Sequence, residues 1–266
     1  MVQVHNFTYG LLTPAFGYAM SCLGAFLGLR CTARSRASTG RSRVGWLLLA
    51  AVSIGTTGIW VMHFIAMLGF TIPGQTIRYD VPVTVLSALV AVIVVSFGLL
   101  VVSLSRGGIG PLLIAGTITG CGVASMHYIG MDAMRMPDTV HYDMFLVIVS
   151  VLIAIAAGTA ALWAALRIRG LWSTLLAALI MGVAVSGMHY TGMAAMRVFP
   201  PAQMAGMSGG ATAGGFLLPL IFGISVLTLI VTLIIVLSPT EQELREDAAL
   251  MERIGEGWPE RVQRQE

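Results

Sequence analysis

The amino-acid sequence predicts an all-α membrane protein with seven transmembrane helices. The first observation is composition: 57% of the 266 residues are hydrophobic and only 10% are charged, whereas a soluble domain carries about 25% charged residues. The second is that seven stretches reach the roughly 20 apolar residues that cross a bilayer. The third is that the segments between them are too short for a soluble catalytic domain. We therefore expect residues 1–238 to form one membrane domain.

The apolar windows define the expected elements in chain order. The predicted spans are 7–29, 46–69, 82–105, 111–131, 144–166, 173–196 and 216–238. Residues 239–266 then form a hydrophilic tail, in which Thr240 and Glu243 have the spacing of a helix capping box. We expect this tail to be one short helix.

The basic residues predict how the chain sits in the membrane. The sequence contains no lysine, and its arginines gather in alternate short loops. Because such loops face the cytoplasm, the N-terminus is predicted outside and the tail inside in a multi-pass membrane protein. The same distribution argues against binding to nucleic acid. The arginines in question are Arg30, Arg34, Arg36, Arg41, Arg43, Arg106, Arg167 and Arg169.

A repeat divides the seven spans further. The second, fourth and sixth spans end on a shared Met-His-aromatic-x-x-Met pattern, centred on His63, His127 and His189. The third and fifth spans begin after Asp80 and Asp143, and the first is aligned with them after Asn6. These matches predict three parallel helix-hairpin repeats followed by a seventh, unpaired helix.

The repeated histidines are the candidate metal ligands. Each lies about 7 to 9 Å from the centre of its span on the same side, because a helix rises about 1.5 Å per residue. Histidine inside the membrane needs a partner, and three imidazoles with an open fourth position form a known metal arrangement. His63, His127 and His189 are therefore expected to bind one ion if the even spans pack innermost. A hydrogen-bonded cluster without metal is the alternative.

Methionine favours copper over zinc as the bound ion, because thioether sulfur is a soft ligand suited to Cu(I). Methionine recurs four residues after each histidine and, in two copies, seven residues after it, which on a helix is the histidine face. Packing in the core is the alternative role for any one of them. The candidate ligands are Met67, Met131, Met193, Met134, Met196, Met62, Met126 and Met188.

Five further residues could contact the ligands and help to position them. Asn6, Asp80 and Asp143 could orient imidazoles, but each also stands where a helix N-cap belongs, which is the preferred reading. Tyr128 and Tyr190 could belong to the site or to the aromatic belt at the membrane surface.

The threefold pattern, Met126-His127-Tyr128 and Met188-His189-Tyr190 with the variant Met62-His63-Phe64, resembles the MHYT domain of bacterial membrane proteins. The resemblance covers most of the chain. It implies an inner-membrane sensor domain whose Met, His and Tyr residues bind copper and, through it, a diatomic gas such as O₂, CO or NO. Family members often carry cyclic-di-nucleotide enzymes, whereas this chain is expected to signal through a cytoplasmic or membrane partner.

Two other functions stay open at this stage. A zinc ion on the three histidines could serve a membrane hydrolase, with Asp132, Asp80 or Asp143 as general base. A metal transporter would need ligands across the whole bilayer, and the even spans offer few below the histidines. A binding and sensing module is preferred, so enzymatic activity is not expected.

Overall fold

The computed structural model describes residues 2–105, 108–200 and 209–237. The chain divides into two compact units, Met1–Leu229 and Ile230–Glu266. Within the described residues, seven helices are long and apolar enough to cross a membrane, which confirms the predicted fold class. The expected tail helix over 239–266 lies outside the described residues.

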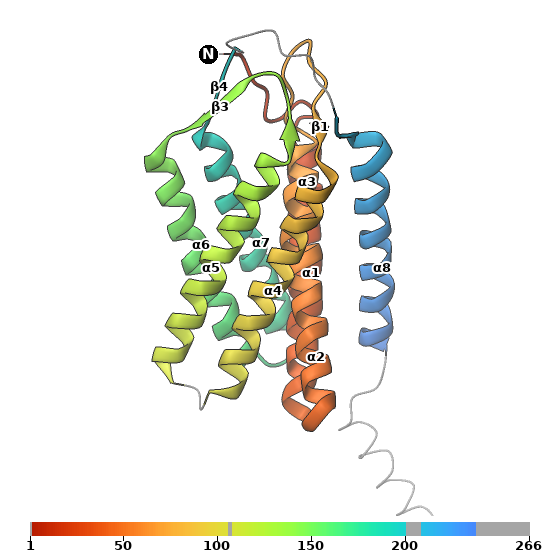
Figure 1. Cartoon of the computed structure of the whole chain (residues 1–266). Coiled ribbons are helices and arrows are strands. Elements are labelled where there is room, and N and C mark those ends of the chain that lie inside the picture. Colours follow the sequence, from red (N-terminus) through yellow and green to blue (C-terminus); the bar gives the residue numbers. More distant parts are fainter. Residues whose placement is uncertain (1, 106–107, 201–208, 238–266) are drawn as a thin grey trace, which may run out of the picture. The chain divides into compact units, whose positions relative to one another are not determined.

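The elements follow one another along the chain as Figure 1 shows. The helices are α1 (Leu12–Ala37), α2 (Gly40–Val52), the π-helix η1 (Ser53–Val61), α3 (Met62–Met67), α4 (Val81–Leu104), α5 (Ile109–Asp132), α6 (Met144–Arg167), α7 (Leu171–Ala195), the π-helix η2 (Ala213–Leu217) and α8 (Leu218–Leu237). The short strands are β1 (Arg78–Tyr79), β2 (Met134–Arg135), β3 (Thr139–Tyr142), β4 (Met196–Phe199) and β5 (Ala211–Thr212).

The second span combines α2, η1 and α3 without interruption. Its π-helical segment begins at Ser53, whose hydroxyl donates to the Leu49 carbonyl at 2.8 Å. The Thr56 hydroxyl donates in the same way to the Val52 carbonyl at 2.6 Å. Such back-bonds compete with the helical ladder and bend helices. His63 follows this irregular segment directly.

The first helix departs from its predicted bounds at both ends. Residues before Leu12 are not helical, because the backbones of His5 and Thr71 exchange hydrogen bonds of 2.9 and 2.8 Å and residues 8–11 form a turn. Asn6 is therefore not the helix start that the repeat suggested. At its other end α1 continues through Arg30 to Ala37, since arginine is a good helix former that extends its charged head away from apolar surface.

The hairpins pack in a closed ring within the first unit. The second span packs on α1, α5 on α4, and α7 on α6. Between hairpins, η1 contacts α4, α5 contacts α6, and α7 contacts α1. At one end of the ring, α3, α5 and α7 contact one another pairwise. At that end the even spans therefore lie innermost, as the histidine hypothesis requires.

Small residues permit this close packing. A Cβ added at Gly120 would approach the Ala154 carbonyl oxygen of α6 to 2.6 Å, and one added at Gly182 would approach the Cys22 sulfur of α1 to 2.6 Å. Gly187 of α7, in contrast, has nothing within 4 Å of an added Cβ. Close helix packing therefore depends on Gly120 and Gly182 but not on Gly187.

The two ends of the ring have different chemistry. We call the end where α3 finishes the histidine end, because His63, His127 and His189 lie near it, and the opposite one the arginine end. At the arginine end, the Arg36 guanidinium donates to the carbonyls of Ala165 and Ile168, which closes the end of α6. These bonds tie the first hairpin to the third.

Candidate metal centre

The three repeated histidines meet in space. His63 is the second residue of α3, and His127 and His189 lie in the last two turns of α5 and α7. Their Nδ1 atoms form a triangle, with His63 3.0 Å from His127, His63 3.0 Å from His189, and His127 3.3 Å from His189. All three residues are almost fully buried.

The rings are arranged like blades around this triangle. Each pair of ring planes is nearly perpendicular, at 83° to 88°, and ring centroids are 4.9 to 5.0 Å apart. Three nitrogens on a tetrahedral ion with bonds of about 2.0 to 2.1 Å would stand about 3.3 to 3.4 Å apart. The observed separations of 3.0 to 3.3 Å are within a few tenths of this spacing. The trio therefore fits one small transition-metal ion.

Hydrogen bonds within the trio cannot satisfy all three nitrogens. A neutral imidazole presents each nitrogen either as a donor or as an acceptor. Around a triangle of three Nδ1 atoms, at least one contact must then join two donors or two acceptors. A cation removes the conflict, because every Nδ1 can offer it a lone pair while the proton stays on Nε2. The trio can therefore hold one metal ion, although Nε2 of His63 and Nε2 of His127 are buried without a hydrogen-bond partner.

Two glycines that were not among the predicted site residues leave room for the imidazole rings. A Cβ added at Gly130 of α5 would stand 2.5 Å from Nε2 of His63. A Cβ added at Gly192 of α7 would overlap Nε2 of His127. The signal was present in the repeat, because the residue three places after each histidine is small, with Ala66 in the first copy. Each of these two glycines gives room to the histidine of the preceding repeat.

The candidate methionine ligands are all buried near the same end of the ring. Met67, Met131 and Met193 lie on α3, α5 and α7, as the helical argument assumed. Met134 and Met196 do not, because α5 and α7 have ended and these residues belong to β2 and β4. Placing them on the histidine face by helical angle was therefore wrong. The role of the eight methionines as ligands stays a prediction.

The two tyrosines take different partners. The Tyr128 hydroxyl is 2.7 Å from the Ser150 hydroxyl of α6, a partner that the sequence did not suggest. The Tyr190 ring packs on Phe7 with centroids 5.4 Å apart. The Tyr190 hydroxyl and the Asn6 side-chain oxygen are two of several described side-chain atoms that are buried without a hydrogen-bond partner.

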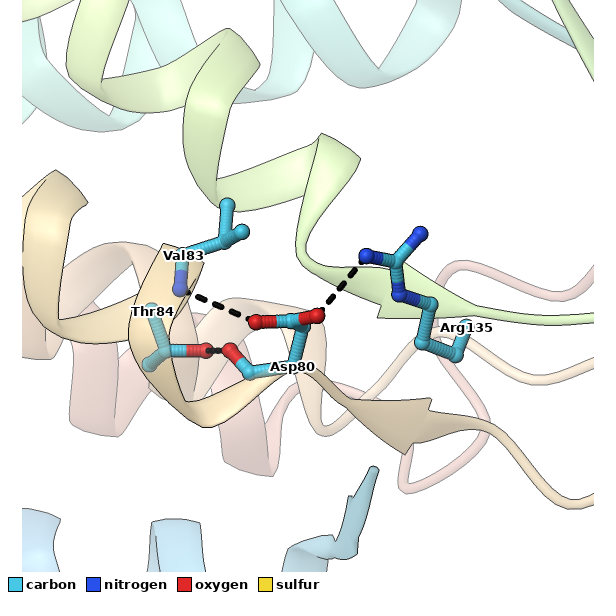
Figure 2. A network of polar contacts seen from close by, with 4 residues as sticks. All are labelled: Asp80, Val83, Thr84 and Arg135. Atoms are coloured by element: carbon cyan, nitrogen blue, oxygen red, sulfur yellow. Dashed lines mark hydrogen bonds and ion pairs between the residues drawn. The ribbon is translucent and has the colours of Figure 1, made fainter. Parts of the chain in front are cut away.

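The two aspartates cap helices. One Asp80 oxygen accepts a hydrogen bond from the Val83 N–H at 3.1 Å, and the other forms an ion pair with Arg135 at 2.7 Å. Figure 2 shows both contacts. The Arg135 guanidinium lowers the pKa of the Asp80 carboxyl, and the Val83 bond acts in the same direction. Asp143 likewise accepts from the first N–H groups of α6 and lies 3.7 Å from Arg197. Both carboxylates hold the histidine end together.

Comparison with known proteins identifies relatives of this chain. The MHYT family, described as a bacterial signalling protein N terminal repeat, matches residues 57–115 and 120–178. These segments contain His63 and His127. His189 lies beyond both, in the copy that only the internal repeat reveals. No solved structure matches the chain significantly.

Curated relatives are larger signalling proteins. The bifunctional diguanylate cyclase/cyclic di-GMP phosphodiesterase MucR of Pseudomonas aeruginosa is 36% identical over 90% of this chain and 35% of its own length. The cyclic di-GMP phosphodiesterase NbdA of the same organism is 38% identical over 75% of this chain and 26% of its own length. The signaling protein YkoW of Bacillus subtilis is 30% identical over 73% and 25%. The chain thus spans about a third or less of these relatives.

Proposed function

Because the chain belongs to the MHYT family of bacterial signalling proteins and is a multi-pass inner-membrane protein, we propose that it is a metal-dependent sensor module. His63, His127 and His189 hold one ion, copper in preference to zinc. The signal is the ion itself or a diatomic gas that reaches it. A signalling partner receives the response.

The observation that carries this proposal is the triangle of Nδ1 atoms, 3.0 to 3.3 Å on a side and buried where three helices meet. When bound, the ion supplies a coordination position that three histidines leave open. The three rings are buried, and their Nδ1 atoms lie close enough together to hold one ion between them.

Copper is preferred because the surroundings are soft. Eight methionines, which include Met67, Met131 and Met193, are buried around the histidine end. Thioether sulfur is a soft ligand that suits Cu(I). The burial of these side chains also suits Cu(I), which carries one charge and is cheaper to place in an apolar site than a divalent ion.

The path from the ion to a partner runs through η1 and α8. His63 follows the π-helix η1, a type of irregularity that is frequent at functional sites. Within η1, the buried Thr57 hydroxyl is 2.6 Å from the Thr228 hydroxyl of α8. A shift of α3 is thereby coupled to the last described helix. By analogy with the named activities of MucR and NbdA, the partner makes or breaks down cyclic di-GMP.

A zinc hydrolase has less support. Its general base would be a carboxylate beside the ion, but the oxygens of Asp80 and Asp143 are engaged with helix N-termini and arginines. Asp132, the last residue of α5, is exposed. Sensing is therefore preferred over hydrolysis.

Elemental analysis of purified protein tests the proposal. We expect about one copper per chain in the wild type, loss of the copper in His127→Ala, and retention in His141→Ala, whose exposed histidine lies in β3 away from the trio. Zinc in place of copper would move the assignment to the hydrolase. Folded wild-type protein without any transition metal would refute both.

A further inference from the structure

A small cavity lies between the helices of the three hairpins. Its volume is about 50 Å³, and residues from α1, η1, α4, α5, α6 and α7 line it. Aliphatic side chains dominate the lining, among them Ile59, Val95, Val123 and Val185. Every hairpin therefore contributes walls to one common space.

The cavity lies one helical turn below the histidines. Ile59, Val123 and Val185 each precede a histidine of the trio by four residues, and all three line the cavity. Positions four apart share a face of a helix and are separated by about 6 Å along it. The cavity thus occupies the same central axis as the Nδ1 triangle, on its inner side.

The apolar lining of the cavity is unfavourable for a bound water molecule. A buried water needs 2 to 4 polar partners, but the hydroxyl groups in the lining come only from Ser21 and Thr119 among the lining residues. The Thr119 hydroxyl already donates to the Val94 carbonyl at 3.3 Å. Apolar cavities of this kind stay dry and take up apolar molecules instead.

The volume limits the size of such a molecule. A dry cavity of about 150 Å³ takes up benzene, with six heavy atoms, which is about 25 Å³ per atom. The cavity here, about 50 Å³, corresponds to about two heavy atoms. From its size, its aliphatic lining and its place on the axis, we infer that this cavity is a docking site for an uncharged diatomic gas.

The role of this cavity rests on the proposed function, because a gas molecule bound there would lie one helical turn from the ion that the histidines hold. The binding of a gas to the cavity, however, does not require the ion. Occupancy of the cavity and binding of metal are separate measurements, so either can fail alone.

Xenon, which enters apolar cavities, is the probe for the test. The full chain, with methyl groups of Ile, Leu and Val labelled for NMR, is titrated with xenon in nanodiscs, without metal and after loading with copper. We expect saturable shifts at Ile59, Val123 and Val185 in both samples. Dissolved oxygen, a paramagnetic diatomic gas, should broaden the same methyl resonances more than those of Val183, which faces outward with 62% of its surface exposed.

Matched variants on α7 separate the cavity from the lipid face. Val185→Phe fills the cavity and should abolish the xenon shifts at Ile59 and Val123, whereas Val183→Phe should leave them unchanged. If Val185→Phe does not fold, Ala161→Leu, which alters another lining residue, takes its place. Absence of saturable shifts at Ile59 and Val123 in folded wild type overturns the inference, even if copper binds. Saturable shifts in a protein that binds no metal would support the docking site and refute the proposed function.

Discussion

Replacing Gly130 by alanine tests how tightly the metal centre is constrained. The new Cβ would stand 2.5 Å from Nε2 of His63, whereas ordinary contact begins at 3.4 Å. The imidazole must therefore move by about 0.9 Å, while metal–ligand distances tolerate only about 0.2 Å. The metal-free protein can relieve the clash by turning His63 away, but the metal-bound protein cannot.

The expected cost follows from this difference. Inserting a methyl group into a well-packed site costs about 1 to 3 kcal/mol, and a penalty confined to the metal-bound state weakens binding by about 5- to 150-fold. Gly187→Ala is the matched control, because it adds the same methyl group to an equivalent helix where nothing lies within 4 Å. That control should bind metal as the wild type does and gain helix stability of about 0.5 to 1 kcal/mol.

Competition with a Cu(I) chelator measures the affinities of the three proteins, and thermal unfolding without metal reports whether each is folded. The reasoning is refuted if folded Gly130→Ala binds copper as tightly as the wild type. Equal loss of affinity in Gly187→Ala would refute it too, because the effect would then be general to added methyl groups.

Three further outcomes are expected. Arg135 lowers the pKa of the Asp80 carboxyl in the folded protein. The stability from their ion pair is therefore complete above the unfolded-state pKa of this carboxyl and is lost as the pH falls through its folded-state pKa. Between about pH 6 and about pH 3, the Tm of the wild type should fall more than that of Asp80→Asn. Equal falls would contradict this. A double-mutant cycle with Thr57→Val and Thr228→Val should give a coupling of about 0.6 kcal/mol in the free energy of unfolding. Thr56→Val is the control, because the Thr56 hydroxyl bonds within its own helix. Absence of coupling would refute a contact between η1 and α8 that contributes to stability. Removing bound metal with a chelator should lower the Tm, because ligand at about 100 times its Kd contributes about 2.7 kcal/mol; an unchanged Tm in protein proven to have held metal would disagree.

The sequence by itself determined the class of fold and the candidate ligands. Apolar length identifies spans because the bilayer interior leaves backbone groups no partner outside a helix. The repeated Met-His pattern identified His63, His127 and His189, because an ionisable residue inside the membrane is energetically costly unless it has a binding partner. The caps at Asp80 and Asp143 were also readable, since capping depends on the few residues around a helix start.

Local patterns misplaced features that depend on distant contacts. The start of α1 was predicted too early, because Asn6 resembles the other helix starts, but pairing of His5 with Thr71 and the turn at residues 8–11 keep its segment out of the helix. Met134 and Met196 were assigned to helices that had already ended in strands β2 and β4. Hydrophobicity and periodicity report neither of these events.

Only the tertiary structure decided that three imidazoles meet within 3.0 to 3.3 Å. That distance depends on how the hairpins close into a ring and on the room beside Gly130 and Gly192, which belong to other helices than the rings they accommodate. The cavity below the trio likewise exists only where side chains from six helices fail to fill their common centre. A sequence records which residues recur, whereas the space between them is set by packing of segments far apart in the chain.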